Sequence, residues 1–468
     1  MIRRTRIVCT LGPSSASPGV LRNLITAGMD VARLNFSHGD EETHRAAATN
    51  VRAAAEAVGR RIALLGDLQG PKIRTGTLDA AFQRLVRGRE VVLTAAPRRA
   101  PEEIEVSHRE LIDALRKGDR VLLDDGRIEL IVRETGDDRA SCSVVRGGLL
   151  GERRGVSVPG RTPPLPALTE KDLKDLKLAV DLGVDYVALS FVRRPEDVLE
   201  CRVRLDALGC DAPIIAKLEK LEAIRELDKI LEVAGAVMVA RGDLGVELKL
   251  GELPAVQKEV IDRANRAGVP VITATEMLES MVTSNRPTRA EASDVANAIW
   301  DGTDAVMLSQ ETSVGAHPVE AVRAMARICL SAQRHPTFQR QRQIWREPGQ
   351  IGSAIAHAAA ASADELKARV IIAFTESGTT ALRCSKARPA VPIIAASPNA
   401  AVLRRTALYS GVIPLLVSPG KDTDEMFANA TEAALRSGFV REGDRVVIVA
   451  GVPVGKPGQT NLLKVETI

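Results

Sequence analysis

The sequence contains few aromatic residues, and this scarcity limits the ligands that it can bind. Phenylalanine, tryptophan and tyrosine make up 2% of the 468 residues. Proteins that bind single-stranded nucleic acid stack the bases on aromatic side chains. The 64 lysines and arginines nearly match the 60 aspartates and glutamates, so the net charge is only +4 and does not favour a polyanion. We therefore expect no nucleic-acid partner, and cations for an anionic small molecule must be placed locally.

Paired cysteines and long apolar segments are also absent. The six cysteines are scattered without a C-x-x-C pair, which predicts reduced thiols rather than disulfides or zinc ligands. Hydrophobic residues make up 45% of the chain, yet no run is long enough to cross a bilayer. The first predicted strand follows the N-terminus without an apolar signal segment. We expect a cytoplasmic protein with no membrane partner.

Eight short apolar runs recur along the chain, and most alternate with amphipathic segments of helix length. Strands buried on both faces read in this way, so the runs predict a parallel sheet. Eight such strands predict an α/β fold, a (β/α)8 TIM barrel, with catalytic groups at the C-terminal strand ends. The expected strands are 6–10, 31–35, 62–67, 187–190, 214–217, 236–241, 271–275 and 305–309. The polar residues expected at one mouth are Arg33, Asn35, Asp67, Lys217, Arg241 and Thr275.

The barrel pattern is interrupted once and followed by a further segment. Short β-like runs between glycine and aspartate turns predict an inserted small all-β lid domain, a β-barrel over 72–157. The catalytic TIM-barrel domain would be discontinuous, with residues 1–71 and 158–334, and its second part would begin with a helix capped by Thr169 and Asp172. Residues 335–468 predict a C-terminal α/β domain with a smaller open parallel sheet. Its strands are expected at 370–374, 393–395, 411–414 and 446–449.

Two carboxylates follow neighbouring predicted strands and suggest a metal site. Glu219 comes after one strand and Asp243 after the next, so they should lie side by side at the mouth. Oxygen ligands with open water positions suit Mg²⁺ or Mn²⁺. The alternative is that Asp243 only caps the following helix and Glu219 sits in a solvated turn.

Cations crowd the same mouth. Lys217 ends a strand between apolar residues and is either a functional cation or an aliphatic stem whose head reaches solvent. Two loops add further polar groups beside it, namely Arg33, Asn35, Ser37 and His38 in one and Asp67, Lys72 and Arg74 in the next. Guanidinium and ammonium groups together suit a phosphoryl group. A network of ion pairs at the barrel rim is the alternative.

Seven ordered segments carry a resemblance that covers essentially the whole chain. They are VCTLGPSS (8–15), GMDVARLNFSHG (28–39), DLQGPKIRTG (67–76), LPALTEKDLKDL (165–176), MVARGDLGVE (238–247), TATEMLESM (273–281) and RPTRAEASDVANAIWDGTDAVMLSQET (286–312). The chain resembles the pyruvate kinase family, and in particular its bacterial, potassium-independent members. The resemblance implies a phosphotransferase of glycolysis that moves the phosphoryl group of phosphoenolpyruvate to ADP and yields pyruvate and ATP. It also implies a mobile lid, an allosteric C-terminal domain and a homotetramer.

The resemblance further implies roles for single residues. Glu219 and Asp243 would hold one Mg²⁺, and a second would arrive with the nucleotide. Lys217, Arg33, Arg74 and Thr275 would be catalytic, with Thr275 next to the pyruvate methyl group. The substrate carboxylate would meet the backbone amides of Gly242 and Asp243. The residues expected to bind the nucleotide are Pro13, Asn35, His38, Arg74 and Arg154, and Asp125 is expected to close over the site from the lid.

Lys72 marks a departure that concerns potassium. Members of the family that need K⁺ resemble one another in having Thr-Lys after the aspartate and a glutamate at the position of Lys72, where this chain has Leu68, Gln69 and Lys72. The equivalents of the K⁺ ligands, namely Asn35, Ser37 and Asp67, are retained. A tethered ammonium has the charge of K⁺, so we expect Lys72 to replace the ion and K⁺ not to be required. The alternative is that Lys72 points to solvent at the lid hinge.

A loop in the C-terminal domain resembles the family's effector site. Hydroxyl groups and a glycine precede a predicted helix, an arrangement that can bind phosphate; an ordinary capped turn is the alternative. Glu376 replaces a common lysine, and the loop 451–460 has no tryptophan, so a sugar monophosphate or nucleotide monophosphate is expected rather than fructose bisphosphate. The expected effector-binding residues are Thr375, Ser377, Gly378, Thr379 and Thr380.

Three further departures and two other functions remain open. Gln310 and Glu276 replace a glycine and a glutamine, and the lid has Arg153 and Arg154 where lysines are usual. A metal-dependent lyase acting on pyruvate-like enolates also uses a Glu/Asp pair at barrel strand ends. A catalytically silent paralogue would keep the fold and lose the charged residues.

Overall fold

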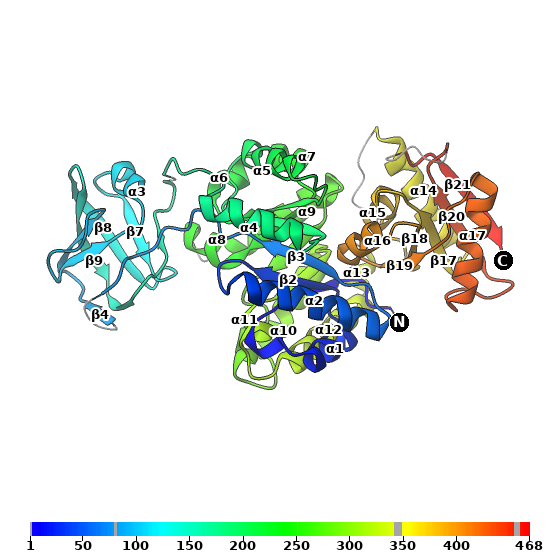
Figure 1. The fold of residues 1–468 in the computed structure, drawn as a ribbon, viewed down its shortest axis with the longest axis horizontal. Helices are drawn as coiled ribbons and strands as arrows, with labels where there is room; N and C mark the ends of the chain where they lie inside the picture. The colour runs from blue at the N-terminus through cyan, green and yellow to red at the C-terminus, as the bar shows by residue number, and fades with distance from the viewer. Residues whose placement is uncertain (1, 79–81, 162, 250, 341–348, 454–458) are drawn as a thin grey trace.

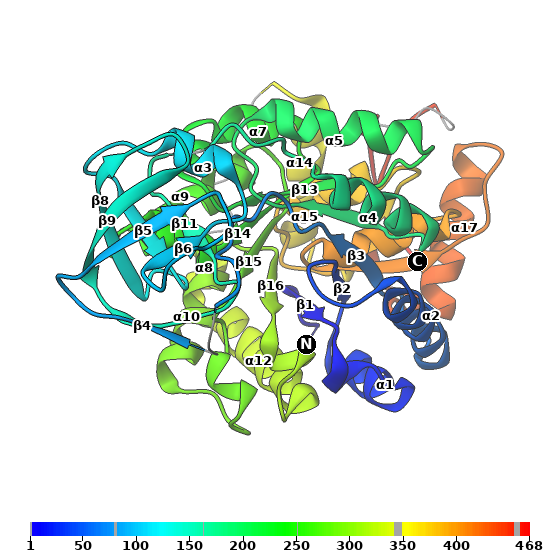
Figure 2. The same cartoon turned by 60° about the vertical axis from the view of Figure 1, so that its left-hand side comes forward.

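The computed structural model describes residues 2–78, 82–161, 163–249, 251–340, 349–453 and 459–468. Its three parts follow one another along the longest axis of the molecule, as Figure 1 shows. The inserted lid lies at one end, the barrel lies in the middle, and the C-terminal domain lies at the other end beside the N-terminus. The view in Figure 2 has the same order, with the lid next to helix α8 (Arg241–Glu247).

All eight predicted barrel strands are present, and every neighbouring pair is parallel. Successive residues alternate between two environments, since Ile7 and Cys9 pack under the surrounding helices while Val8 belongs to the cluster inside the barrel. The pairing register sets Asn35 beside Asp67. The closed order is β1-β16-β15-β14-β13-β12-β3-β2. The strands are β1 (Arg6–Thr10), β2 (Val31–Asn35), β3 (Ala63–Asp67), β12 (Tyr186–Leu189), β13 (Ile214–Leu218), β14 (Ala236–Ala240), β15 (Val271–Ala274) and β16 (Ala305–Leu308).

Amphipathic helices cover the barrel. Asp40 caps α2 by accepting a hydrogen bond from the Thr43 amide, and Gly59 ends it with φ 68°. The predicted capping box of α4 is confirmed, because Thr169 and Asp172 bond each other's backbone amides. Besides α8, the helices are α1 (Pro18–Ala27), α2 (Glu41–Val58), α4 (Glu170–Asp181), α5 (Pro195–Ala207), α6 (Leu221–Arg225), α7 (Leu227–Val233), α9 (Leu253–Arg266), α10 (Arg289–Asp301), α11 (Gln310–Ser313), α12 (Pro318–Arg334) and α13 (Pro336–Arg340), with 3-10 turns η1 (Pro13–Ser15) and η2 (Glu279–Val282).

The insertion after β3 is mostly β structure, as expected, but it contains one short helix, α3 (Arg109–Ala114). Its strands form a six-stranded sheet in the order β11-β7-β8-β9-β5-β6 and a separate pair, β10-β4. The strands are β4 (Phe82–Leu85), β5 (Glu90–Thr94), β6 (Glu103–Glu105), β7 (Arg120–Leu123), β8 (Ile128–Thr135), β9 (Arg139–Arg146), β10 (Gly148–Gly151) and β11 (Val156–Ser157).

The C-terminal domain has the four predicted strands and one that was not predicted. The order is β19-β18-β17-β20-β21, and β21 runs antiparallel to β20, so the sheet is mixed rather than parallel. Its elements are α14 (Ile351–Glu365), β17 (Val370–Phe374), α15 (Thr379–Lys386), β18 (Ile393–Ser397), α16 (Ala400–Arg405), η4 (Thr406–Leu408), β19 (Val412–Leu416), α17 (Thr423–Arg436), β20 (Arg445–Ala450) and β21 (Leu462–Thr467).

The C-terminal domain docks on the N-terminal ends of the barrel strands. Asp304, which precedes β16 and is 1% exposed, pairs with Lys386 at 2.6 Å and with Arg388 at 2.8 Å. Arg404 pairs with Asp185 at 2.8 Å, just before β12. The opposite barrel end, where the catalytic residues are expected, therefore faces the lid.

The cysteines and the helices agree with two predictions made for the whole chain. All six cysteines are free, and Cys9 is buried in the core as predicted. Within the described ranges, none of the helices combines the length and apolar character needed to cross a bilayer.

Candidate active site

A buried chain of charges lies at the C-terminal ends of β2, β3 and β13. Arg33 Nε lies 2.6 Å from Asp67 Oδ2, and Lys217 Nζ lies 3.3 Å from Asp67 Oδ1 and 3.0 Å from Glu219 Oε1. Asp67 and Glu219 are 1% and 2% exposed, and Arg33 and Lys217 are each 11% exposed. Strand pairing brings these groups together, as the barrel prediction requires.

The charge state of this chain follows from its contacts. Burial by itself would raise the pKa of Asp67, but the charges of Lys217 and Arg33 hold it below its usual value. Burial would lower the pKa of Lys217, yet Asp67 and Glu219 raise it above its usual value. Lys217 therefore remains an ammonium ion, and it donates a hydrogen bond to Ser190 Oγ at 2.7 Å. A desolvated, oriented cation of this kind can stabilise negative charge.

A cavity of about 520 Å³ lies at the mouth of the barrel. Arg33, Lys217, Glu219, Asp243 and Thr275 all lie on its wall. The lining also includes Asn35 and His38, which were expected on the nucleotide side, and Ser309, Gln310 and Ser313, to which sequence reasoning assigned no role. The polar residues that follow β16 were the available signal for this last group.

Glu219 and Asp243 fit a divalent metal better than they fit a helix cap and a solvated turn. Asp243 is the third residue of α8 and not its cap, which is Ala240, and Glu219 is buried and not in a solvated turn. Burial raises the pKa of Glu219, Lys217 opposes this rise, and the charge of Asp243 adds to it. Both carboxylates line the mouth cavity. Within the described ranges, no group of three or more His, Cys, Asp and Glu side chains is arranged to hold a metal. Two carboxylates with remaining positions for water or substrate match the preference of Mg²⁺.

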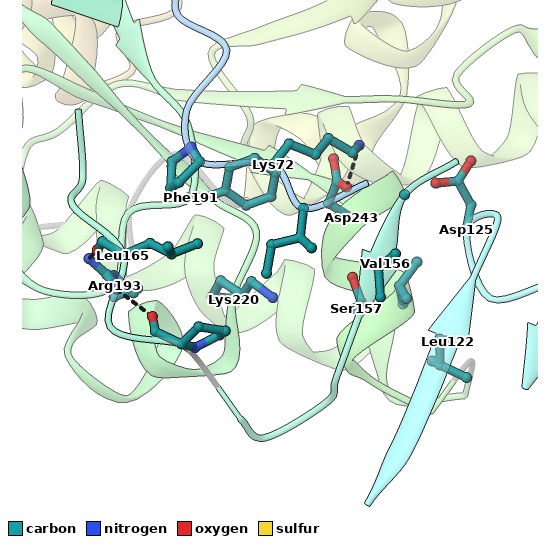
Figure 3. A pocket seen from close by; sticks show the side chains of 15 residues that line it. Lys72, Leu122, Asp125, Val156, Ser157, Leu165, Phe191, Arg193, Lys220 and Asp243 are labelled. Atoms are coloured by element: carbon teal, nitrogen blue, oxygen red, sulfur yellow. Dashed lines mark hydrogen bonds and ion pairs between the residues drawn. The ribbon is translucent and has the colours of Figure 1, made fainter. Parts of the chain in front are cut away.

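Lys72 has a different partner from the one expected. Its ammonium lies 2.9 Å from Asp243 Oδ1, on the carboxylate expected to bind metal. Figure 3 shows this contact, with Phe191 beside the lysine and Asp125 on the lid side. Burial would raise the pKa of Asp243, but Lys72 and neighbouring lysines lower it. Lys72 thus reaches into the junction between lid and barrel, and its side chain is only 25% exposed.

The expected potassium ligands have their own partners. Asp67 pairs with Arg33 and Lys217, and Asn35 Oδ1 accepts a hydrogen bond from the Ser37 amide at 3.2 Å. Among the ion pairs of the described residues, that of Lys72 is with Asp243 rather than with Asp67.

The turn after β15 has an unusual backbone. Thr275 and Glu276 have φ angles of 75° and 54°, in the left-handed region. Each such residue costs about 1–3 kcal/mol, and a β-branched side chain makes the conformation especially unfavourable. A Cβ at Gly242 would lie 3.0 Å from Thr275 Cγ2, so the glycine permits their close approach. The sequence predicted that Thr275 lies at the mouth, but it did not predict the strained backbone conformation of this residue.

Arg241 supports this turn and points away from the cavity. Its guanidinium donates to the Thr275 carbonyl oxygen at 2.6 and 3.1 Å and pairs with Asp294 at 2.6 Å. The sequence predicted Arg241 at the mouth without assigning it a role. Its contacts show that it holds the backbone of the Thr275 turn.

Three of the expected nucleotide-binding residues lie outside the cavity in this structure. Pro13 begins the 3-10 turn η1. Arg74 donates to the Arg153 carbonyl oxygen at 3.1 Å, and Arg154 lies 3.5 Å from Asp124. Among the described residues, these contacts lie within the lid or at its edge, and Arg74, which was also expected to be catalytic, does not line the mouth cavity.

The expected effector loop is an ordered turn before α15. Thr375 Oγ1 accepts a hydrogen bond from the Gly378 amide at 2.9 Å, and Gly378 has φ 93°. Ser377 and Thr379 hydroxyls are 2.9 Å apart, and the Thr380 and Thr460 hydroxyls are 3.1 Å apart. These contacts suit a capped turn as well as a phosphate site. Residues 454–458 of the loop used in the effector prediction lie outside the described residues.

A closed parallel barrel with a lysine, an arginine and two carboxylates around one mouth cavity defines a barrel enzyme suited to phosphoryl groups. Two family models match the chain, "Pyruvate kinase, barrel domain" over residues 2–322 and "Pyruvate kinase, alpha/beta domain" over residues 353–466. The chain therefore belongs to the pyruvate kinase family, a family of phosphotransferases.

Individual relatives agree with this assignment. A pyruvate kinase of Geobacillus stearothermophilus is 47% identical over 476 residues, which span 100% of this chain and 81% of the relative. One of Mycobacterium tuberculosis is 44% identical over 469 residues, with 100% of this chain and 99% of the relative covered. A crystal structure of a pyruvate kinase from Cryptosporidium parvum superposes with a TM-score of 0.92 at 37% identity and covers 99% of this chain and 96% of that one.

Proposed function

We propose that this chain transfers the phosphoryl group of phosphoenolpyruvate to ADP and yields pyruvate and ATP, as the last step of glycolysis in the cytoplasm. The observation that supports this most is the ammonium of Lys217, fixed between Asp67 and Glu219 at 3.3 and 3.0 Å and facing a cavity that it shares with Arg33. Phosphoryl transfer passes through a loose, charge-rich transition state, so positioning and charge stabilisation supply most of the catalysis. Lys217 and Arg33 are the groups placed to supply them.

The remaining roles follow from position around the cavity. Glu219 and Asp243 would hold one Mg²⁺ or Mn²⁺, and a second would accompany the nucleotide. Such a metal would offset negative charge on the substrate oxygens. The Gly242 and Asp243 amides meet the substrate carboxylate, and Thr275 lies on the side where the enolate carbon is protonated.

The nucleotide enters between the barrel and the lid. Asn35 and His38 lie on the cavity wall, whereas Pro13, Arg74 and Arg154 complete the nucleotide site when the lid closes and brings Asp125 over it. We propose three functional domains. Residues 1–71 and 158–334 form the catalytic domain, residues 72–157 form the lid, and residues 335–468 form the effector-binding domain.

A coupled assay with phosphoenolpyruvate, ADP and Mg²⁺ tests the reaction. Formation of pyruvate that depends on ADP and gives equal ATP supports phosphoryl transfer. Activity on pyruvate-like substrates without ADP would instead identify a metal-dependent lyase. Purified, folded enzyme with neither activity would identify a silent paralogue, although Arg33, Lys217, Glu219, Asp243 and Thr275 are all retained.

We also propose that Lys72 makes the enzyme independent of K⁺. A tethered ammonium can supply the charge of the ion, and the partly buried side chain at the lid junction favours this over a solvent-exposed hinge lysine. Lys72 contacts Asp243 in this structure, so the proposal requires its ammonium to move toward Asn35, Ser37 and Asp67 when metal binds.

The K⁺ dependence of variants tests this role. Lys72→Glu should cripple activity in K⁺-free buffer and recover part of it when K⁺ is added, while the exposed Lys177→Glu on α4 should behave like the wild type. The wild type should show less than twofold activation by K⁺ at constant ionic strength, set with a bulky organic cation. Activation of the wild type by tenfold or more would refute the tethered-cation role.

The C-terminal loop is proposed to bind a phosphorylated effector, a sugar monophosphate or a nucleotide monophosphate, in a homotetramer. Thr375, Ser377, Gly378, Thr379 and Thr380 supply hydroxyl and amide donors at the start of α15. The enzyme is titrated with a panel of such monophosphates and with fructose bisphosphate. A monophosphate should lower the KM for phosphoenolpyruvate, whereas fructose bisphosphate should not. Ser377→Asp should abolish the decrease in KM. Light scattering with and without the effector measures the oligomeric state.

A further inference from the structure

The strained turn after β15 must be held by its surroundings. Thr275 and Glu276 have φ 75° and 54°, and the methyl group of Thr275 would contact any side chain at position 242. A β-branched residue leaves this conformation unless neighbouring groups stabilise it. Because Thr275 lines the mouth cavity, whatever holds the turn also sets where its hydroxyl and methyl groups point.

Arg241 supplies the main set of contacts. Its Nη2 donates to the carbonyl oxygens of Thr275 at 2.6 Å and Glu276 at 3.2 Å, and its Nε donates to those of Ala274 at 3.3 Å and Thr275 at 3.1 Å. A planar guanidinium can bind consecutive carbonyl groups in this way, whereas a lysine ammonium offers one point of attachment.

The guanidinium is itself fixed. Its Nη1 lies 2.6 Å from Asp294 Oδ2 on α10, and its side chain is 9% exposed. On the far side of the turn, Glu311 Oε1 accepts a hydrogen bond from the Leu278 amide at 3.0 Å. The turn is therefore held from both ends, and of the two charged groups only Arg241 contacts the strained residues.

Arg241 also belongs to the segment that carries the metal site. It is the first residue of α8, directly before Gly242 and Asp243. Its guanidinium is not among the groups that line the cavity, so its loss would remove no group that touches substrate. Arg241 is thus adjacent to the Asp243 segment in the chain, while its guanidinium contacts the turn of Thr275.

We infer that Arg241 is a positioning residue for the reaction, which acts through Thr275 on the enolate step. The inference rests on the proposed function, because it assigns Thr275 to the side where carbon is protonated. Displacement of a reacting or orienting group by about 1 Å can lower a rate about 10²-fold. Arg241→Met should therefore lower kcat by about 10- to 100-fold and leave the KM for phosphoenolpyruvate and the Mg²⁺ requirement within about twofold.

A double-mutant cycle separates this role from a general structural one. Arg241→Met, Thr275→Ala and the double variant are compared by kcat and by exchange of the pyruvate methyl protons with D2O, followed by NMR in the presence of Mg²⁺ and ATP. If Arg241 acts through Thr275, Arg241→Met should slow exchange in the wild-type background and add less than twofold in the Thr275→Ala background. Arg263→Met, which removes a surface guanidinium paired with Asp228, is the matched control and should leave both rates unchanged.

Two outcomes would overturn the inference. One is a double variant whose rate loss equals the product of the losses in the two single variants. The other is an Arg241→Met variant that loses Mg²⁺ affinity and proton exchange to the same degree. Arg241→Lys replaces Arg241→Met in the cycle if the methionine variant does not fold, and it should retain an intermediate rate. Failure of the wild type to transfer phosphate would refute the proposed function itself, so the two failures are distinguishable.

Discussion

Lys217 is the residue whose surroundings favour one function most strongly. It is protonated because two buried carboxylates offset its desolvation, and it lines the mouth cavity. Replacing one such donor in a water-poor site costs about 10²–10³-fold in kcat. We predict that Lys217→Met lowers kcat at least to this extent even in the fraction of enzyme that remains folded, whereas Lys229→Met, at a lysine that is 67% exposed, has no effect. A Lys217→Met variant that keeps a tenth of the activity would remove Lys217 from catalysis.

The two carboxylates proposed to bind metal give a second prediction. Asp243→Asn or Glu219→Gln removes one of two anionic ligands, so the Mg²⁺ concentration for half-maximal activity should rise at least about tenfold while nucleotide affinity is retained. Mn²⁺ binding to the purified variants, measured by electron paramagnetic resonance, gives the same comparison without turnover. Wild-type metal dependence in both variants would mean that the carboxylates are structural.

The positions of site residues could be predicted from the sequence only where the ends of barrel strands determine them. Arg33, Lys217, Glu219 and Asp243 follow apolar strands, and parallel strands in a barrel place such residues at one mouth. The contact of Lys72 was not predictable, because Asp243 is 171 positions away and lies across the lid junction. The left-handed turn at Thr275 was also missed, since a threonine gives no signal for a positive φ angle.

At the scale of elements, the same limits apply. All eight barrel strands could be predicted because each is a continuous apolar run buried on every side. The short helix α3 and the edge strand β21 were missed. Strand β21, LLKVET, has an exposed, charged character, and its six residues are ordered by pairing with β20. Tertiary pairing of this kind overrides local propensity.

The elements at the base of the barrel give a prediction about stability and pH. Burial would raise the pKa of Asp304, but Arg388 and Lys386 lower it below 3.8. An acid with a lowered folded-state pKa contributes stability that is present above its unfolded value and is lost as the pH falls through the folded value. Asp304→Asn should therefore lower the free energy of unfolding by about 3–5 kcal/mol at neutral pH and weaken its dependence on pH below 3.8.

Urea denaturation at pH 7.5 and at steps down to pH 3 measures both effects. The control is Asp228→Asn, whose carboxylate is 76% exposed in a surface pair with Arg263 and should cost at most about 1 kcal/mol. Equal stability of the two variants would show that the Asp304 pair does not hold the C-terminal domain to the barrel.

At the scale of the whole molecule, the barrel separates two tasks. The lid faces the C-terminal strand ends, where the cavity lies, and the C-terminal domain docks on the opposite ends. The proposed nucleotide site and the proposed effector loop therefore lie on opposite sides of the barrel. The ion pairs Asp304–Lys386 and Asp185–Arg404 join the C-terminal domain to the N-terminal end of the barrel.

Phosphorus NMR of the wild type with phosphoenolpyruvate, ADP and Mg²⁺ in K⁺-free buffer tests the proposed reaction most directly. We predict that the phosphoenolpyruvate resonance disappears while the γ-phosphate resonance of ATP grows by an equal amount, and that Lys217→Met under the same conditions shows neither change. Consumption of phosphoenolpyruvate with release of inorganic phosphate, or no formation of ATP by folded wild-type enzyme with or without K⁺, would contradict phosphoryl transfer at this site.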